Sequence, residues 1–328
     1  MKDIIVQVNE NIQKYNLLKA GDRVLLGVSG GPDSVMLLLA LNELKQKLGI
    51  EIFVAHVNHM IRKEAGQDEM FVRSMCDSMK IECHVLTFDV LCEAKRLKIS
   101  TEECGRNIRY EFFNKLVKDL SLNKIAVAHN LGDNAETILM NMIRGAGLSG
   151  ICGMEFCNNN IIRPMLNIDK RDILEYLDDK QIKYAIDKTN LENDYTRNNI
   201  RNRIIPLLEE INPNFLNGIY RMSESLKQDK EAIDKFVGDE AKTITLQKKN
   251  DEIVIDIKAF DLKQDAIKLR IIRYLLNELL GTLQGIEKIH VEDICKLLSK
   301  KVTRKKYILG NKFTVEILRG KKAKICKN

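Results

Sequence analysis

A glycine-rich hexapeptide near the N-terminus has the composition of an anion-binding turn. It reads Ser29-Gly30-Gly31-Pro32-Asp33-Ser34. Two adjacent glycines let the backbone turn tightly and bring N–H groups close to an anion. Pro32 suits the start of a following helix, whose N-terminus attracts negative charge. The Gly-Lys-Ser/Thr ending of the kinase and GTPase loop is absent, so the motif predicts a different kind of phosphate site.

Two acids three residues apart, Asp133 and Glu136, form a second candidate chemical group. Their spacing predicts that both carboxylates lie on one face of a helix, close to its N-terminus. Such a pair can bind an ammonium group and accept its proton. It can equally be the ordinary acidic start of a helix, so the pair alone leaves both interpretations open.

Arginines and histidines supply the remaining candidates. Arginine can grip a phosphate or a carboxylate through two hydrogen bonds and can stabilise developing charge. The arginine candidates are Arg106, Arg109, Arg197, Arg201 and Arg203. His56 and His129 end expected strands, where ligands bind in parallel sheets. A lone histidine is usually structural, so we expect these two to contact a nucleotide rather than to do chemistry.

The elements that must position these residues alternate between strands and helices. Apolar runs predict strands at residues 23–28, 52–57, 81–86 and 124–128. Helical patterns fall between and after them, at residues 35–48, 64–80, 101–120 and 133–143. This alternation predicts parallel pairing in a layered α/β sheet. Residues 151–168 are loop-like, a helix follows at 169–180, and a basic helix at 197–210 is interrupted at Pro206.

Pro213 and the asparagines around it mark a domain boundary. We expect a catalytic α/β domain over residues 1–213 and a smaller α+β domain over residues 217–328. The second domain combines a charged helix, a strand at 253–257, helices at 265–280 and 291–299, and a final hairpin-like stretch.

The composition excludes several classes of protein. With 328 residues, 45% hydrophobic and 30% charged, the chain has the profile of a soluble globular protein. No apolar run approaches the ~20 residues that cross a bilayer, and the N-terminus lacks the apolar centre of a signal peptide. We therefore expect a cytoplasmic protein without a membrane partner. None of its eight cysteines forms a Cys-x-x-Cys pair, so zinc and iron–sulfur sites have no sequence support.

The net charge of +7 is unevenly distributed. From Lys296 to the end, 12 Lys or Arg accompany one acid, Glu316, so this segment is strongly basic and the rest is mildly acidic. Such a tail predicts a polyanionic partner, although a solvated tail that aids solubility would have the same composition. Its candidate partner-binding side chains are Lys305, Lys306, Lys321 and Lys322. The pattern does not reveal the oligomeric state, and a homodimer is compatible with it.

Four further stretches occur with the hexapeptide in consistent order. They are residues 54–59 (VAHVNH), 102–110 (EECGRNIRY), 128–150 (AHNLGDNAETILMNMIRGAGLSG) and 187–206 (DKTNLENDYTRNNIRNRIIP). The hexapeptide resembles the pyrophosphate-binding loop of the N-type ATP pyrophosphatases, the PP-loop superfamily. The whole set resembles the tRNA(Ile)-lysidine synthetases, in a short form that lacks the second C-terminal domain of longer members.

The resemblance implies an ATP-dependent carbon–nitrogen ligase with a tRNA substrate. That family attaches free L-lysine to the 2-position of the wobble cytidine of tRNA(Ile) with a CAU anticodon. The base is adenylated with release of pyrophosphate, and the ε-amine of lysine then displaces AMP. Because a lysine ammonium has a pKa of about 10.4, the amine must be captured and deprotonated.

The resemblance also implies roles for individual residues. The six loop residues, with His56 and His129, bind ATP, and Asp33 helps to hold Mg²⁺, which neutralises phosphate charge. Asp133 and Glu136 bind lysine. The implied catalytic residues are Asp33, Arg109, Asp133, Glu136 and Arg201. The resemblance does not decide how tRNA is held beyond the anticodon, and the candidate tRNA contacts follow from positive charge instead. They are Arg197, Arg201 and Arg203 of the basic helix, and Lys305, Lys306, Lys321 and Lys322 of the basic tail.

One departure and three alternatives limit this interpretation. Gly132 stands where the family often has the first of two consecutive acids, which removes one carboxylate from the metal or phosphate network. A tRNA thiolase of the same superfamily would need paired or cluster-binding cysteines. An amide-forming NAD or GMP synthetase would leave the basic tail without a reason. A non-catalytic RNA-binding module is disfavoured by the intact hexapeptide and the Asp133/Glu136 pair.

Overall fold

The computed structural model describes residues 3–60, 65–185, 196–300 and 304–328 of the chain. It divides into two compact units, Met1–Leu226 and Lys227–Asn328. The division falls within the long helix α11 (Phe215–Ile244), which contributes to both units. In the described ranges, no helix is long and apolar enough to cross a membrane.

The first unit is built on a six-stranded sheet in the order β3-β2-β1-β4-β6-β5. Its strands are β1 (Arg23–Gly27), β2 (Glu51–Asn58), β3 (Cys83–Thr87), β4 (Lys124–Ala126), β5 (Cys157–Asn158) and β6 (Ile161–Ile162). All pairs are parallel except that of β5 with β6. The chain adds β2 and β3 on one side of β1, and β4 and β6 on the other. Such a reversal opens a crevice at the carboxyl ends of β1 and β4.

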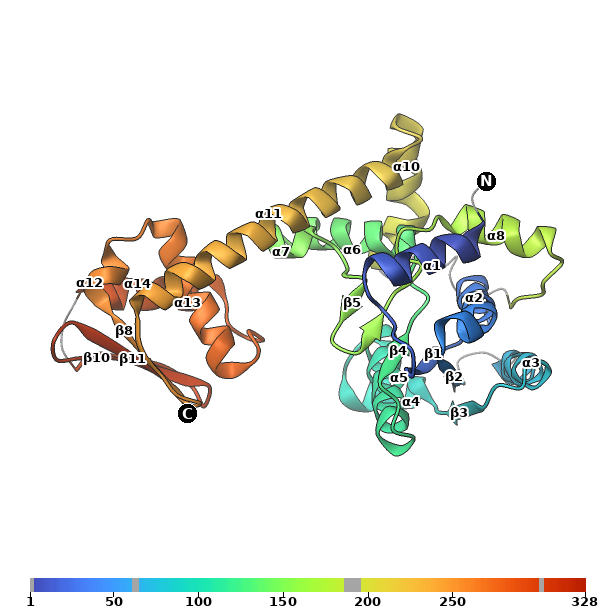
Figure 1. Cartoon of the computed structure of the whole chain (residues 1–328), viewed down its shortest axis with the longest axis horizontal. Coiled ribbons are helices and arrows are strands. Elements are labelled where there is room, and N and C mark those ends of the chain that lie inside the picture. The colour runs from blue at the N-terminus through green and yellow to red at the C-terminus, as the bar shows by residue number, and fades with distance from the viewer. Residues whose placement is uncertain (1–2, 61–64, 186–195, 301–303) are drawn as a thin grey trace. The chain divides into compact units, whose positions relative to one another are not determined.

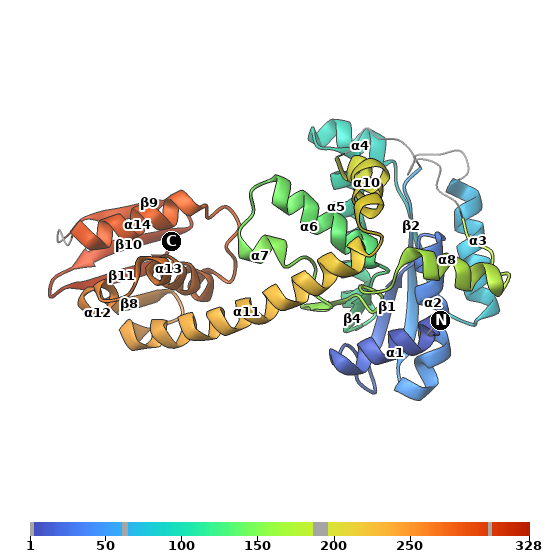
Figure 2. The same ribbon diagram turned by 90° about the horizontal axis from the view of Figure 1, so that it is seen from above.

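Helices cover both faces of this sheet (Figures 1 and 2). The helices of the first unit that precede α11 are α1 (Ile4–Lys14), α2 (Pro32–Leu48), α3 (Ala65–Ser78), α4 (Val90–Leu97), α5 (Thr101–Asp119), α6 (Leu131–Ile143), α7 (Leu148–Ile151), α8 (Lys170–Asp179), α9 (Thr196–Asn199), the π-helical turn η2 (Ile200–Ile204) and α10 (Ile205–Ile211). One core packs α1, α2, α3 and α8 against the sheet, and a second packs α5 against its other face. The layered α/β fold predicted from the sequence is confirmed.

Burial explains why α2 and α5 lie where they do. The helix α2 is apolar around most of its circumference, and Leu37, Leu38 and Leu41 are fully buried in the first core. On the other face, a Cβ added to Gly27 would lie 2.7 Å from the ring of Phe113 of α5. Gly27 thus lets α5 pack directly on the backbone of β1, beside the phosphate loop.

Several elements differ from the sequence prediction. The helix α1 was missed, although its buried residues Ile4, Ile5, Val8 and Ile12 recur at helical spacing. The helix α4 was also missed. The helix α2 begins three residues earlier than predicted, because Gly31 caps it and Pro32 takes its first position.

The two stretches beyond α6 also differ from prediction. Residues 151–168 contain the end of α7 and the strands β5 and β6, so they are not all loop. The basic helix is a succession of α9, η2 and α10, so its α-helical hydrogen bonding is interrupted by the π-helical turn just before Pro206, which occupies the first turn of α10. The first half of the fourth motif, residues 187–195, lies outside the described residues.

The second unit is a smaller α+β structure, as predicted. Its antiparallel sheet has the order β7-β8-β11-β10-β9. The strands are β7 (Thr245–Lys248), β8 (Glu252–Asp256), β9 (Lys306–Leu309), β10 (Phe313–Leu318) and β11 (Lys322–Lys327), and the helices are α12 (Ile257–Asp261), α13 (Asp265–Leu280) and α14 (Lys288–Lys300). One core joins Phe260 of α12, Ile272 of α13 and Phe313 of β10. The alternate side chains of β10 and β11 face away from this core.

Candidate active site

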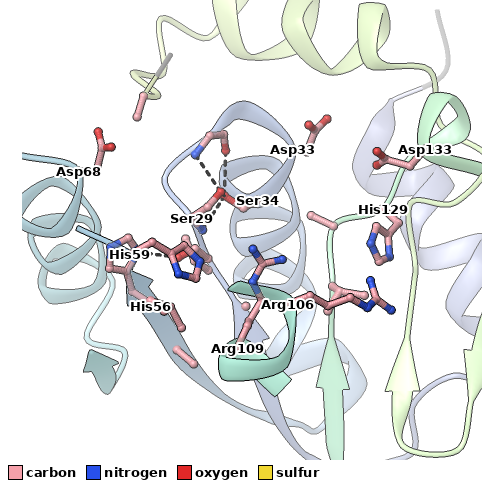
Figure 3. Close-up of a pocket in the computed structure, with 18 of the residues that line it drawn as sticks. Ser29, Asp33, Ser34, His56, His59, Asp68, Arg106, Arg109, His129 and Asp133 are labelled. Carbon is pink, nitrogen blue, oxygen red and sulfur yellow. Dashed lines mark hydrogen bonds between the residues drawn. The ribbon is translucent and has the colours of Figure 1, made fainter. Parts of the chain in front are cut away.

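The phosphate loop joins β1 to α2 and is held by its own two serines. The Oγ of Ser34 accepts a hydrogen bond from the backbone N of Ser29 (3.1 Å) and donates to the carbonyl oxygen of Gly31 (2.9 Å). The two hydroxyls also lie 3.2 Å apart (Figure 3). Gly30 has a φ of +90°, a conformation that disfavours any side chain. The loop therefore presents its backbone, together with the N-terminus of α2, to an anion.

Asp33 lies in the first turn of α2 and points into the same cleft (Figure 3). Its Oδ1 accepts a hydrogen bond from the Nδ2 of Asn130 (2.9 Å), and its Oδ2 lies 3.7 Å from the Nζ of Lys170. Burial raises the pKa of Asp33, although Lys170 and Asn130 oppose this effect. No cluster of three or more metal-ligating side chains occurs in the described parts of the chain. Asp33 fits Mg²⁺ that arrives with a polyphosphate, because that ion takes one or two carboxylates, phosphate oxygens and water.

The cleft has a volume of about 470 Å³ and opens at the carboxyl ends of β1, β2 and β4. Its walls include the loop residues, His56, His59, Arg106, Arg109, His129 and Asp133 (Figure 3). His56 is buried, and the strand β2 places its Nδ1 2.9 Å from the carbonyl oxygen of Val28. Burial lowers the pKa of His56 and, with the neighbouring Arg109, lowers that of His59 to about 4. Both rings are therefore neutral at physiological pH.

Two arginines of α5 face the cleft without an acidic partner. Among the residues that the structure describes, no carboxylate lies within ion-pair distance of Arg106 or Arg109. The guanidinium of Arg106 lies 5.0 Å from the ring centroid of Tyr110. Burial lowers the pKa of Arg109, which nevertheless stays charged at neutral pH. These two cations give the cleft an unneutralised positive wall that suits a phosphate or phosphoryl group.

Two acids and two arginines form a tight cluster beside this wall. Glu136 is 2% exposed, and its carboxylate accepts from the Nε of Arg201 (2.5 Å) and the Nε of Arg197 (2.7 Å). The Oδ1 of Asp133 accepts from Nη2 of the same arginines, at 2.9 Å from Arg201 and 3.3 Å from Arg197. Burial lowers the pKa of Arg201, but the bond to Glu136 and the charge of Asp133 raise it above its usual value.

The residues predicted to bind lysine or tRNA do not all line the cleft. Asp133, Arg197 and Arg201 line the cleft, whereas Glu136 lies behind them and does not. Arg203 is exposed and also lies outside the lining. The four predicted lysines Lys305, Lys306, Lys321 and Lys322 belong to the second unit, where all are exposed. Lys306 lies 3.4 Å from Glu316 on the neighbouring strand β10.

Sequence reasoning missed Asn130, Lys170, His59, Asp68 and Arg163. Asn130 had a usable signal, because Asn followed three residues later by Asp is a helix-capping pattern. The Oδ1 of Asn130 accepts from the N of Asp133, and the Oδ2 of Asp133 accepts from the N of Asn130. Since Asn130 also donates to Asp33, it links the start of α6 to the phosphate loop. Lys170 lies in the charged run Asp169-Lys170-Arg171-Asp172, which has the composition of an ordinary helix start, so it had no such signal.

Fold and site together define an α/β phosphate-binding domain. A family model described as a PP-loop domain matches residues 3–208. The chain is 40% identical over 297 residues to a tRNA(Ile)-lysidine synthase of Clostridioides difficile, covering 90% of this chain and 64% of that protein. It is 38% identical over 233 residues to one of Petrotoga mobilis, covering 71% of this chain and 75% of that protein. The chain therefore belongs to the PP-loop family and, within it, to the tRNA(Ile)-lysidine synthase family.

A solved structure shares the fold. It is the U34-tRNA thiolase NcsA from Methanococcus maripaludis with its [4Fe-4S] cluster, at a TM-score of 0.57 and 22% identity. The match covers 69% of this chain and 80% of that one. The chain spans 63–65% of the length of three of the curated relatives that it matches.

Proposed function

We propose that the protein ligates free L-lysine to the 2-position of the wobble cytidine of tRNA(Ile) with a CAU anticodon. The reaction would pass through an adenylated tRNA and release AMP and pyrophosphate. One observation carries the proposal, namely that a single cleft joins an anion-binding loop, two arginines without acidic partners and an acid–arginine cluster. Membership of the family supports it, and we expect the reaction in the cytoplasm.

ATP would bind with its β and γ phosphates on the loop of residues 29–34. The backbone N–H groups of the loop and the N-terminus of α2 favour these charges. Asp33 would hold Mg²⁺, which neutralises phosphate charge when it is bound. His56 and His129 would contact the nucleotide from the ends of β2 and β4.

Adenylation would follow when O2 of the cytidine attacks the α phosphorus and pyrophosphate leaves. Negative charge builds on the phosphoryl oxygens in this step. Arg109, supported by Arg106, already faces the cleft without a counter-ion and can take up that charge. Because the arginines are held by α5, they need little reorganisation during the reaction.

Lysine transfer would use the acid–arginine cluster. The ε-amine attacks C2 of the base, the C2–O bond breaks, and AMP leaves with the oxygen. Asp133 lines the cleft and would meet the ammonium directly, whereas Glu136 would act from behind it. Since both carboxylates are bonded to Arg197 and Arg201, the ammonium would replace one guanidinium as their partner. The displaced arginine would then be available for the RNA or for catalysis.

The second unit would contribute tRNA binding. Its sheet carries Lys306 on β9 and Lys322 on β11 at positions that alternate with core residues, and Lys305 and Lys321 precede these strands. Lysine contacts to phosphate add affinity without reading the sequence. Arg197, Arg201 and Arg203 would meet the RNA from the catalytic unit.

Labelled ATP tests the proposal. The protein would be incubated with ATP labelled in its α phosphate, with or without lysine, and with tRNA carrying CAU or an altered wobble base. We expect AMP and pyrophosphate only with the CAU tRNA, and a tRNA heavier by lysine minus water only when lysine is present. ADP as the main product, or AMP formation that ignores the anticodon, would refute the assignment.

A matched pair of variants controls this assay. Asp33→Asn removes the acid from the first turn of α2 and should abolish AMP release. Asp172→Asn removes the acid from the first turn of α8, where it does not line the cleft, and should leave AMP release unchanged. Equal loss in both variants would mean that Asp33 acts only on folding.

A further inference from the structure

Arg163 is a buried cation that the proposed reaction does not use. It follows β6 directly and is 7% exposed, yet no carboxylate within the described ranges pairs with it. Its guanidinium donates from Nη1 to the carbonyl oxygen of Glu155 (2.9 Å) and from Nε to the Nδ1 of His129 (3.2 Å). Burying an arginine without an acidic partner costs free energy, so the contact of Arg163 with His129 suggests a functional role for Arg163.

The contact fixes the tautomer of His129. A guanidinium carries five N–H donors and no acceptor, so the Nδ1 that receives its hydrogen bond must be unprotonated. The one proton of the neutral ring therefore lies on Nε2. Burial lowers the pKa of His129 to about 4, with Arg163, Arg197 and Arg106 acting in the same direction and Asp133 against them. His129 is thus a neutral ring whose free nitrogen is a donor.

His56 has the opposite arrangement in the same cleft. Its Nδ1 lies 2.9 Å from the carbonyl oxygen of Val28, which can only accept, so Nδ1 carries the proton and Nε2 is an acceptor. That Nε2 has no partner in the described structure. The two histidines therefore differ in hydrogen-bond polarity, and only His129 can donate to an oxygen of a bound substrate.

We propose that Arg163 is a positioning residue that locks His129 as an Nε2–H donor, aimed at an acceptor oxygen of the substrate. It follows that His129 does not act as a general base in this cleft. The identity of the oxygen rests on the proposed function, in which it belongs either to a nucleotide phosphate or to the cytidine carbonyl. The tautomer itself is independent of that function.

Nitrogen NMR tests the tautomer on the full-length protein. The chain has five histidines, and a His129→Gln variant assigns the His129 signal in protein labelled with ¹⁵N-histidine. In the wild type we expect a pyridine-like Nδ1 and a pyrrole-like Nε2 that do not change between about pH 8 and 5.5. In Arg163→Met we expect a mixture of tautomers. A wild-type ring protonated on Nδ1 would overturn the inference, whether or not the enzyme makes lysidine.

Kinetics test the consequence. Arg163→Met should lower AMP release about 10- to 100-fold, the range for residues that orient another group at a site. His129→Gln keeps a donor near the Nε2 position, and adding Arg163→Met to it should cause little further loss, because the two residues act as a unit. Fully additive losses would show that Arg163 acts only on folding and would refute the positioning role.

Two further measurements complete the test. Arg163→Lys retains a charged donor and should keep the wild-type tautomer, so it decides the question if Arg163→Met does not fold. ATP affinity measured without tRNA distinguishes the two oxygens. Weaker ATP binding in Arg163→Met indicates a phosphate oxygen, and unchanged ATP binding with slow adenylation indicates the cytidine carbonyl. Wild-type ATP binding and wild-type adenylation together would overturn the proposal.

Discussion

Replacing Glu136 by glutamine should destabilise the first unit and block lysine transfer. Glu136 is 2% exposed, and its carboxylate bonds to Arg197 and Arg201. The cluster of two acids and two arginines is neutral, and the substitution leaves it with one uncompensated positive charge. Glutamine also turns an amide N–H₂ toward a guanidinium N–H, where two donors face each other.

The magnitude follows from the burial of the partners. Removing one member of a buried ion pair costs about 3–5 kcal/mol. The side chains of Arg197 and Arg201 are 23% and 32% exposed, so water relieves part of that penalty. We therefore expect the free energy of unfolding to fall by about 2–4 kcal/mol.

Urea unfolding followed by circular dichroism measures this loss. Glu51→Gln is the matched control, because Glu51 pairs with Arg23 at the surface with a side chain that is 69% exposed. That control should lose about 1 kcal/mol or less, and its loss should shrink in high salt, unlike that of Glu136→Gln. A Glu136→Gln loss no larger than the control would refute our account of a buried, doubly paired carboxylate.

The same variant separates the two chemical steps. In the proposed reaction, adenylation depends on the loop and on α5, so Glu136→Gln should still adenylate tRNA under conditions where it is folded. Mass spectrometry of the tRNA should then show an accumulating or slowly hydrolysed adenylate and little lysidine. If adenylation and lysine transfer fall equally, the division of labour between Asp33 and Glu136 is wrong.

Three further predictions concern the loop, the histidines and the basic lysines. Asn130→Asp keeps the cap of α6 but places a second carboxylate against Asp33, so it should raise the pKa of Asp33 further. The acid limb of the pH–rate profile for AMP release should then shift to higher pH. An unshifted limb would contradict the contact between Asn130 and Asp33. His59 and His129 have folded pKa values of about 4 against about 6.5 when unfolded, so the unfolded state gains protons first. The free energy of unfolding should be at its full value above about pH 6.5 and should fall toward pH 4, by on the order of 1–2 kcal/mol per ring at about pH 5. Urea unfolding midpoints measured across this pH range test the prediction. The His129→Asn variant should lose less stability on acidification than the wild type. Reversing the charge of Lys305, Lys306, Lys321 and Lys322 should weaken tRNA binding and reduce the log–log salt slope by roughly 2–4 units, independently of the wobble base. Reversal of Lys230, Lys235, Lys242 and Lys258 is the control, and a folded first variant with wild-type affinity and slope would mean that these lysines are only a solvated surface.

The sequence alone determined the elements whose signal is local. The alternation of apolar strands with helices predicted the parallel sheet, because each buried strand and each covering helix has its own periodicity. The hexapeptide at residues 29–34 predicted the phosphate loop, since a tight turn with two glycines before a helix is specified by adjacent residues. The helix α1 was missed although its pattern was present, and the start of α2 was misjudged by three residues at Pro32.

Only the tertiary structure decided which of the predicted side chains face the cleft. Arg197 and Arg201 lie 61 to 68 residues beyond the acids that they contact. No local sequence pattern predicts that α9 and η2, which carry these arginines, pack against α6. Asp133 and Glu136 lie three residues apart on the same face of α6, yet packing buries the carboxylate of Glu136 and leaves that of Asp133 in the cleft. Arg163 reaches His129 because β6 pairs with β4. Burial and long-range pairing follow from the order of strands in the sheet, which is a property of the folded chain and not of any window of its sequence.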